Sequence, residues 1–417
     1  MATQASSSAI SPNRAALLFI LLTSFLGSMG IGLITPVAPF LVSRYVTDPN
    51  STGLVLGWLI SIYAVCQFIA APALGVLSDR YGRRPILLIC LFGSAVGYLL
   101  FGLGGALWVL FLGRIIDGIT GANFAVTFAY IADVTPPEQR GRYFGLTGAI
   151  VGIGFILGPT IGGFLATYGY TMPLYIAAAI TFLNVIFGFL FAPESLPRSA
   201  RAKHINTAQL NPFSVLGKVS SIRSLRWLLI VTFLYSVPLA AIQANLSLFA
   251  KDTLGWDAES VGILFALIGL TDIVTQGVLL GRMLPRLGER RMVVLGLLSE
   301  LLGYVLLASV LLLHSPIPIV IGTIIFAFGD GLIGPSIGGL LANAADTQNQ
   351  GQVQGGSQAV QALARILGPI LGGVLYDQVG YAVPYLSGAV IVLIAALVMS
   401  MMLPPLRTSA LAADPQP

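Results

Sequence analysis

Apolar residues are grouped into twelve long runs along the chain, and short polar stretches separate most of these runs. An α-helix of about 20 mostly apolar residues crosses the hydrocarbon core of a bilayer. Each run therefore predicts one transmembrane helix. The runs cover approximately residues 15–42, 53–77, 84–103, 106–132, 142–167, 171–192, 226–250, 258–284, 291–313, 317–343, 353–377 and 381–404.

A polar, basic segment at residues 193–225 divides the twelve runs into two groups of six. We predict an all-α membrane protein of twelve transmembrane helices, arranged as two pseudo-symmetric six-helix bundles. The N-terminal bundle would cover residues 1–192, the segment 193–225 would be a cytoplasmic linker, and the C-terminal bundle would cover residues 226–417.

The composition agrees with this pattern and excludes a soluble protein. The chain of 417 residues is 56% hydrophobic and 9% charged, whereas soluble domains contain about 25% charged residues. Its net charge of +5 does not indicate nucleic-acid binding, because the basic residues flank apolar runs and suit a membrane surface. Cys66 and Cys90 lie inside apolar runs, so we expect neither a disulfide nor a metal site.

Lys and Arg residues collect on one side of the predicted membrane, the side that holds both termini. Loops on that side hold seventeen of the 21, and the opposite loops hold only Arg44 and Lys251. Because such residues are enriched in cytoplasmic loops, we expect both termini in the cytoplasm and the protein in a plasma membrane, specifically a bacterial inner membrane. The seventeen are Arg14, Arg80, Arg83, Arg84, Arg140, Arg142, Arg198, Arg201, Lys203, Lys218, Arg223, Arg226, Arg282, Arg286, Arg290, Arg291 and Arg407.

Three short motifs occur once in each half of the chain. The glycine- and proline-containing segment 158–163 recurs at 368–373, and Asp117-Gly118 recurs as Asp330-Gly331. A charged hairpin after the second run recurs in weaker form after the eighth. All three pairs keep spacings of about 206–213 residues, which predicts two halves with related folds, as in many transporters.

The charged hairpin at residues 75–85 must face water. Asp79 ends the second run, where the helix dipole disfavours a negative charge, so we expect it to engage a cation or the N-terminus of another helix. Gly82 suits a tight turn with positive φ, and Arg83 and Arg84 can reach anionic lipid. The hairpin residues that we expect to act together are Gly75, Asp79, Arg80, Gly82, Arg83 and Arg84.

The segment 158–163 predicts a kinked and closely packed helix. Pro159 removes one backbone hydrogen bond from the fifth run. Neighbouring glycines expose bare backbone for close helix contact, which is also compatible with ordinary packing. These glycines are Gly154, Gly158, Gly162 and Gly163.

Ionisable residues inside the runs are the strongest indication of function, because each costs about 2.5–3.5 kcal/mol at the centre of a membrane helix. Arg114 and Asp117 are three residues apart and share a helix face. They are candidates for proton coupling, with a purely structural ion pair as the alternative. Asp330, Asp272 and Glu300 are the remaining acidic candidates.

A polar stripe runs along the eleventh span. Its members are spaced by four, three and four residues and therefore share one helix face, which we expect to line a cavity and contact substrate. The alternative is that Arg365 neutralises Asp330 and that the glutamines are structural. The stripe consists of Gln354, Gln358, Gln361 and Arg365. Further candidate cavity residues are Gln67, Asn123, Gln243 and Asn245.

With these motifs, the chain resembles the major facilitator superfamily over nearly its whole length. The hairpin 75–85 is typical of the superfamily, and the segment 158–163 is typical of its antiporters. Within the family the chain looks like the twelve-span drug/proton antiporters, most of all the tetracycline/proton branch. Other matching segments are 30–36, Arg114 with 118–122, 130–133 and 193–195.

The resemblance implies roles for these residues. The hairpin would form a cytoplasmic latch that closes in one state, and the segment 158–163 would seal the path between the two sides. Spans 1, 4, 7 and 10 would line a central cavity, where Arg114, Asp117 and Asp330 could exchange protons.

The chain also departs from the tetracycline branch at several positions. Gly27 and Gly97 stand where that branch has acids, and Asp272 replaces a His, whereas Glu300 retains an acid. The resemblance therefore does not by itself identify tetracycline as the substrate.

We predict a secondary-active transporter that exports amphiphilic drugs in exchange for protons by alternating access. It would work as a monomer in the lipid bilayer, with a small amphiphilic substrate and protons as its partners and no nucleic acid. No Walker motif is present, so we expect the proton gradient, without a cofactor, to supply the energy. Uptake of a small metabolite by symport or uniport is the alternative, and a non-transporting receptor or scaffold is a more distant one. The sequence shows no nucleophile–base pair of the kind that would indicate an enzyme.

Overall fold

The computed structural model describes residues 14–203, 211, 223–344 and 350–401, and contains no strand in those segments. Twelve helical segments are long and apolar enough to cross a membrane. The prediction of twelve spans in an all-α, multi-pass membrane protein is therefore confirmed. Large apolar side chains remain exposed along many of these helices, as expected for surfaces that face lipid.

The helices of the first half are α1 (Arg14–Ile34), α2 (Ala38–Val42), η1 (Pro49–Ser51), α3 (Thr52–Tyr81), α4 (Arg83–Leu103), α5 (Leu107–Thr120), α6 (Phe124–Val134), α7 (Pro137–Ala166), α8 (Met172–Phe191) and η2 (Arg198–Ala200). Those of the second half are α10 (Arg223–Leu254), α11 (Ala258–Val274), the π-helical turn η4 (Thr275–Leu279), α12 (Leu280–Leu287), α13 (Glu289–Leu313), α14 (Pro316–Asn343), α15 (Gln350–Gln378) and α16 (Val383–Met401).

Two predicted spans are interrupted. The span expected at 15–42 ends at Ile34, because Pro36 lacks a backbone N–H and disfavours helical geometry in the residue before it. The span expected at 106–132 is broken between α5 and α6. There Gln67 donates a hydrogen bond from its Nε2 atom to the Gly121 carbonyl oxygen at 3.2 Å, which satisfies an acceptor that the break leaves free.

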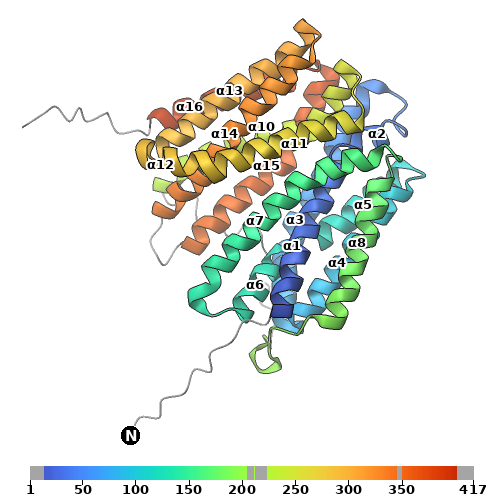
Figure 1. Ribbon diagram of the computed structural model, residues 1–417, viewed down its shortest axis with the longest axis vertical. Coiled ribbons are helices and arrows are strands. Elements are labelled where there is room, and N and C mark those ends of the chain that lie inside the picture. Colours follow the sequence, from blue (N-terminus) through green and yellow to red (C-terminus); the bar gives the residue numbers. More distant parts are fainter. Residues whose placement is uncertain (1–13, 204–210, 212–222, 345–349, 402–417) are drawn as a thin grey trace, which may run out of the picture.

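The helices form two groups, α1 to α8 and α10 to α16, which converge at one end and diverge at the other (Figure 1). We call the end with the α3–α4 and α12–α13 turns the basic end, and the end with α2 and the α10–α11 turn the opposite end. Most of the predicted linker 193–225 lies outside the described residues, as do Lys218 and Arg407.

The two groups touch near the opposite end. Gly163 of α7 meets Gly262 of α11, since a Cβ added to Gly163 would lie 2.7 Å from the Gly262 Cα atom. Toward the basic end of α7, a Cβ added to Gly145 or Gly148 would meet nothing within 4 Å. This part of α7 is unpacked at these glycines, at the end where the two groups of helices diverge (Figure 1).

Candidate functional site

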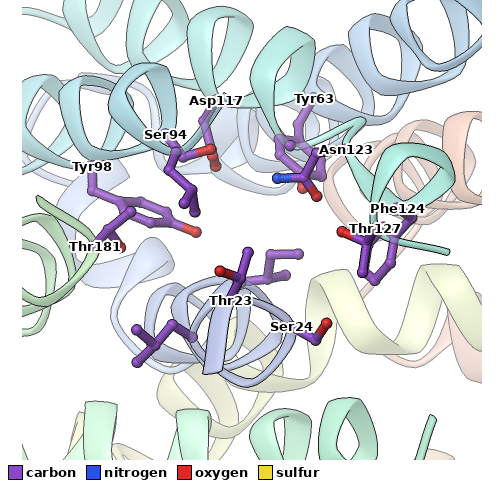
Figure 2. Close-up of a pocket in the computed structure, with 15 residues that line it drawn as sticks. Thr23, Ser24, Tyr63, Ser94, Tyr98, Asp117, Asn123, Phe124, Thr127 and Thr181 are labelled. Carbon is purple, nitrogen blue, oxygen red and sulfur yellow. The ribbon is translucent and has the colours of Figure 1, made fainter. Parts of the chain in front are cut away.

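A pocket lies among α1, α3, α4, α5, α6 and α8 of the first half. Figure 2 shows hydroxyl and amide side chains around it, including Thr23 on α1, Ser94 and Tyr98 on α4, and Thr127 on α6. Asn123, one of the predicted cavity residues, lines the same pocket. Leu and Ile side chains of α1 and α4 complete the wall, so the pocket combines apolar surface with several hydrogen-bonding groups.

Asp117 faces this pocket and is paired. Its side chain is almost fully buried, and its Oδ2 atom lies 3.2 Å from the Nη1 atom of Arg114. The Arg114 guanidinium stacks on the Tyr63 ring at 4.1 Å from the centroid, and such cation–π contact further stabilises the charge. The structure thus forms the ion pair that sequence analysis gave as the structural alternative, and the Asp117 member of this pair lines the pocket.

Position 97 explains how Asp117 fits. A Cβ added to Gly97 on α4 would lie 2.8 Å from the Cβ of Asp117 on α5. A larger residue at position 97 would therefore displace Asp117. Gly27 lines the same pocket and has nothing within 4 Å of its added Cβ. Gly97 therefore leaves room for the Asp117 carboxylate, and Gly27 leaves open space in the same pocket.

Three carboxylates gather around one turn of α14 in the second half. Asp330 lies on α14, and it interacts electrostatically with Asp272 and with Glu300. Glu300 on α13 packs on Gly329, whose added Cβ would lie 3.0 Å from the Glu300 Cγ atom. Asp272 lies beside Gly331, with its Oδ1 atom 3.2 Å from the added Cβ. Sequence positions 272, 300 and 330 thus converge at one place.

These three carboxylates differ from Asp117 in their partners. Within the described segments, none of them has an ion pair at 4.0 Å or less. Glu300 is 0% exposed, and neither of its carboxylate oxygens has a hydrogen bond. The buried Oδ1 atom of Asp272 also has no hydrogen bond.

The polar stripe of α15 faces accessible space. Gln354, Gln358 and Arg365 are exposed, while Gln361 donates to the Ser357 hydroxyl at 3.3 Å. Arg365 interacts electrostatically with Tyr63 on α3 and with Tyr235 on α10, and so it faces the space between the halves. An Arg365–Asp330 ion pair is not formed among the described residues.

The other predicted cavity residues have different surroundings. Gln243 is exposed on α10. Asn245 is fully buried on the same helix, with its Nδ2 atom 2.5 Å from an added Cβ of Gly372 on α15. Gln67 is held by the Tyr63 hydroxyl at 3.3 Å and by the α5–α6 break.

The hairpin residues are bonded within their own half. Gly82 has φ 106°, as predicted for this turn. The Arg83 Nη1 atom lies 2.5 Å from an Asp79 carboxylate oxygen, and its Nε atom lies 3.3 Å from an Asp133 oxygen. Arg80 lies over the Tyr81 ring.

The two remaining hairpin residues are Arg84 and Gly75. Arg84 donates to the Phe189 carbonyl on α8. A Cβ added to Gly75 would meet nothing within 4 Å. In the part of the chain that the structure describes, no ion pair joins the hairpin to the second half.

The glycines of the segment 158–163 and Gly154 pack as predicted for close helix contact. A Cβ added to Gly158 would lie 2.6 Å from the Met29 carbonyl oxygen on α1, and one added to Gly162 would lie 2.5 Å from that of Leu33. Gly154 on α7 abuts Ser28 on α1. Pro159 fits against Gly32, so the proline-containing helix and α1 approach through their backbones.

Sequence analysis missed most of the hydroxyl groups of the pocket. Thr23, Ser94, Tyr98 and Thr181 line it, yet such side chains are common in membrane helices, where they can bond to their own backbone. No spacing distinguishes those that face a pocket. Asp377, which accepts hydrogen bonds from the Gly53 and Leu54 N–H groups of the other half, was also missed, because an acid at the end of a membrane run is not unusual.

Comparison with known proteins agrees with this architecture. The family model described as Major Facilitator Superfamily matches residues 20–366 and, in a second match, 228–416. The tetracycline resistance protein of class C from Escherichia coli is 36% identical over 367 residues, which cover 87% of this chain and 89% of that protein. Multidrug resistance protein 2 of Bacillus subtilis (strain 168) is 30% identical over 371 residues, covering 88% and 90%.

A solved structure shares the fold at low sequence identity. The xylose transporter XylE from E. coli, in a partially occluded inward open conformation, has a TM-score of 0.71 and 16% identity, with 95% of this chain and 98% of that chain covered. At this identity the likeness concerns the fold alone.

Proposed function

The chain belongs to the major facilitator superfamily, and from this we propose that it is a secondary-active transporter that exports amphiphilic compounds in exchange for protons. Support for export comes from the relatives that match almost end to end, which are tetracycline and multidrug resistance proteins. Nothing in the site favours an enzyme, and uptake of a small metabolite has no specific support.

The observation that carries the proposed coupling is the group of three carboxylates around α14. Asp272, Glu300 and Asp330 lie within membrane-spanning helices and have no ion pair among the described residues. Both Glu300 carboxylate oxygens and the Oδ1 atom of Asp272 are buried without a hydrogen bond. A negative charge inside a membrane span costs free energy. Protonation removes that charge and therefore lowers the cost of burying the carboxylate. We therefore propose that these carboxylates bind and release the transported protons, with Asp330 nearest to the centre of the group.

The substrate would bind in the pocket of the first half. Because Arg114 and Asp117 neutralise each other, the pocket wall has hydrogen-bonding groups but no unbalanced charge. Such a pocket suits an amphiphilic molecule whose polar edge meets hydroxyl and amide groups and whose apolar face meets Leu and Ile side chains. The α15 stripe of Gln354, Gln358, Gln361 and Arg365 would form the facing wall.

The membrane orientation follows from the basic loops. We propose that the basic end faces the cytoplasm, as the distribution of Lys and Arg favours, in a bacterial inner membrane. The structure would then be an inward-facing state that admits substrate from the cytoplasm. Protons arriving from outside would drive the return from the outward-facing state, in a monomer that needs no cofactor.

Counterflow in proteoliposomes with an imposed pH gradient tests this proposal. We expect a lipophilic dye to move against the proton flux, and Asp330→Asn to reduce gradient-driven transport about tenfold or more. The matched control is Asp48→Asn, which changes an acid in the exposed α2–α3 connection. Movement of dye with the protons would support uptake instead, and full gradient-driven transport by Asp330→Asn would remove Asp330 from the mechanism.

A further inference from the structure

The N-terminus of α3 is capped by a residue from the other half of the molecule. The first N–H groups of a helix have no partner within it, and the preceding Ser51 makes no side-chain hydrogen bond to them. Asp377, near the C-terminal end of α15, accepts from the Gly53 N–H at 3.0 Å and from the Leu54 N–H at 2.6 Å. A carboxylate at a helix N-terminus is favoured by both hydrogen bonding and the helix dipole.

Close packing holds the carboxylate in this place. Gly373 lies against the Gly53 carbonyl, and Gly57 lies against the carbonyl of Pro369, at distances that leave no room for a Cβ. One turn further, the Ser61 hydroxyl donates to the Ile366 carbonyl at 2.7 Å. The helices α3 and α15 therefore form a tight antiparallel pair at the opposite end.

The register of this pair has a consequence at the basic end. Position 53 faces 377, position 57 faces 369 and position 61 faces 366. Continued along both helices, the same register places Asp79 opposite the start of α15 at Gln350. Each helix thus has a carboxylate near its own C-terminal end, opposite the N-terminus of its partner.

Among the described residues, only one of these two contacts is formed. Asp377 caps α3, whereas the side chain of Asp79 is 48% exposed and pairs with Arg83 of its own half.

We propose that Asp377 is the latch of the opposite end. It holds α3 to α15 while the basic end is open, and its two hydrogen bonds must break before the opposite end can open. At the basic end, the hairpin with Asp79 would form the latch that the family resemblance implies.

Two other polar contacts lie near Asp377, but neither could take over its hydrogen bonds to α3. The Tyr376 hydroxyl donates to Asp252 at 2.9 Å within the second half. Lys251 Nζ donates to the Ser43 hydroxyl at 2.7 Å, between the halves. Neither contact reaches the N–H groups of α3.

Cysteine accessibility in two places tests the latch. In a Cys66→Ala, Cys90→Ala background, Gly148→Cys reports on the basic end, where an added side chain meets open space. Ala258→Cys reports on the opposite end, where Ala258 is 1% exposed beside Gly163. Reaction rates with a small maleimide are measured on the purified protein in nanodiscs, without drug or pH gradient.

Losing two hydrogen bonds to a charged group is expected to shift the balance between the two states about tenfold. Asp377→Ala should therefore speed the labelling of Ala258→Cys and slow that of Gly148→Cys, and Asp377→Asn, which keeps one acceptor, should do so less. The control Asp257→Ala removes a carboxylate cap that bonds within its own half, to the Ser260 N–H, and should change neither rate.

Unchanged rates in both Asp377 variants would overturn the proposal. If Asp377→Ala does not elute as a folded protein in size-exclusion chromatography, the labelling rates of the isosteric variant Asp377→Asn alone test the proposal. The inference rests on the alternation between two states in the proposed function. Labelling needs no transport, however, so a failure of proton-coupled export would leave this result intact, and the reverse also holds.

Discussion

The two halves meet at two pseudo-equivalent interfaces, α3 with α15 and α7 with α11, and these are held together differently. In both, the last glycine of the repeated motif touches the backbone of the other half: Gly373 meets Gly53, and Gly163 meets Gly262. The α3–α15 interface adds hydrogen bonds between the halves. At the α7–α11 interface, the contact is backbone packing at these glycines, continued where Gly269 abuts Ile156.

The helix N-termini explain this difference. The helix α11 is capped by its own Asp257, which accepts from the Ser260 N–H at 2.9 Å. The helix α3 has no such cap and takes Asp377 from α15. Thr167, 210 positions before Asp377, bonds only to its own helix. We infer that α7–α11 is a packed pivot that can turn without breaking charged contacts, whereas α3–α15 is a bonded gate.

The largest effect is expected from filling the gate. In Gly373→Val, side-chain atoms would occupy the space of the Gly53 carbonyl. Such overpacking is destabilising, and no flexible side chain can move aside here because the clash is with backbone atoms. Dye transport should fall about tenfold or more, since 1.4 kcal/mol already corresponds to tenfold. Gly148→Val is the matched control, because its added side chain enters open space. Near-normal transport by Gly373→Val would show that the close approach is not needed.

A smaller effect is expected from the cap of the pivot. Asp257→Ala should lower the free energy of unfolding by about 1 kcal/mol, as for other N-caps, and leave the labelling rates at positions 148 and 258 unchanged. Thermal unfolding in detergent gives the first quantity. A shift in the labelling rates would contradict the pivot and show that both interfaces gate the molecule.

The pH dependence of this cap has a defined sign. Hydrogen bonds from Ser260 lower the pKa of Asp257, so the carboxylate stabilises the fold above the ordinary Asp pKa of about 3.9. This contribution is lost as the pH falls through the lowered value. The difference in unfolding temperature between wild type and Asp257→Ala should therefore be constant from about pH 6 to about pH 8. It should shrink below about pH 4.

The smallest effect is expected from Ser61→Ala in the gate. It removes the hydrogen bond to the Ile366 carbonyl, and such bonds between membrane helices contribute about 0.6 kcal/mol on average. Transport should change less than about threefold. A loss as large as that of Gly373→Val would mean that this hydroxyl, and not the close backbone approach, holds the gate.

The sequence predicted the spans because apolar length is a direct requirement of the bilayer. It missed the break after Ile34, although Pro36 signals it, because the apolar run continues through Val42. The break at Gly121 depends on Gln67 from another helix, and no local pattern reveals that contact.

The candidate site was predictable only in part, for a physical reason. A charged residue in a membrane helix costs free energy, so its presence in an apolar run is conspicuous in the sequence. Asp117, Asp330 and Glu300 were recognised as candidates for this reason. The spacing of Arg114 and Asp117 already offered their ion pair as an alternative, whereas the isolation of Glu300 depends on how the helices pack and required the structure. Asp377 was hidden because an acid at the end of a span costs little and is unremarkable without the uncapped helix it serves.

The most direct test of the account is a pair of distance measurements between spin labels in or next to the membrane spans Gln139–Ala166 and Ala258–Leu287. One pair, Gly145→Cys with Gly277→Cys, reports on the basic end, and the other, Tyr168→Cys with Glu259→Cys, reports on the opposite end. The account predicts that acid pH or added dye shortens the first distance whenever it lengthens the second. Distances that stay fixed at both ends, or that change in the same direction, would contradict alternating access.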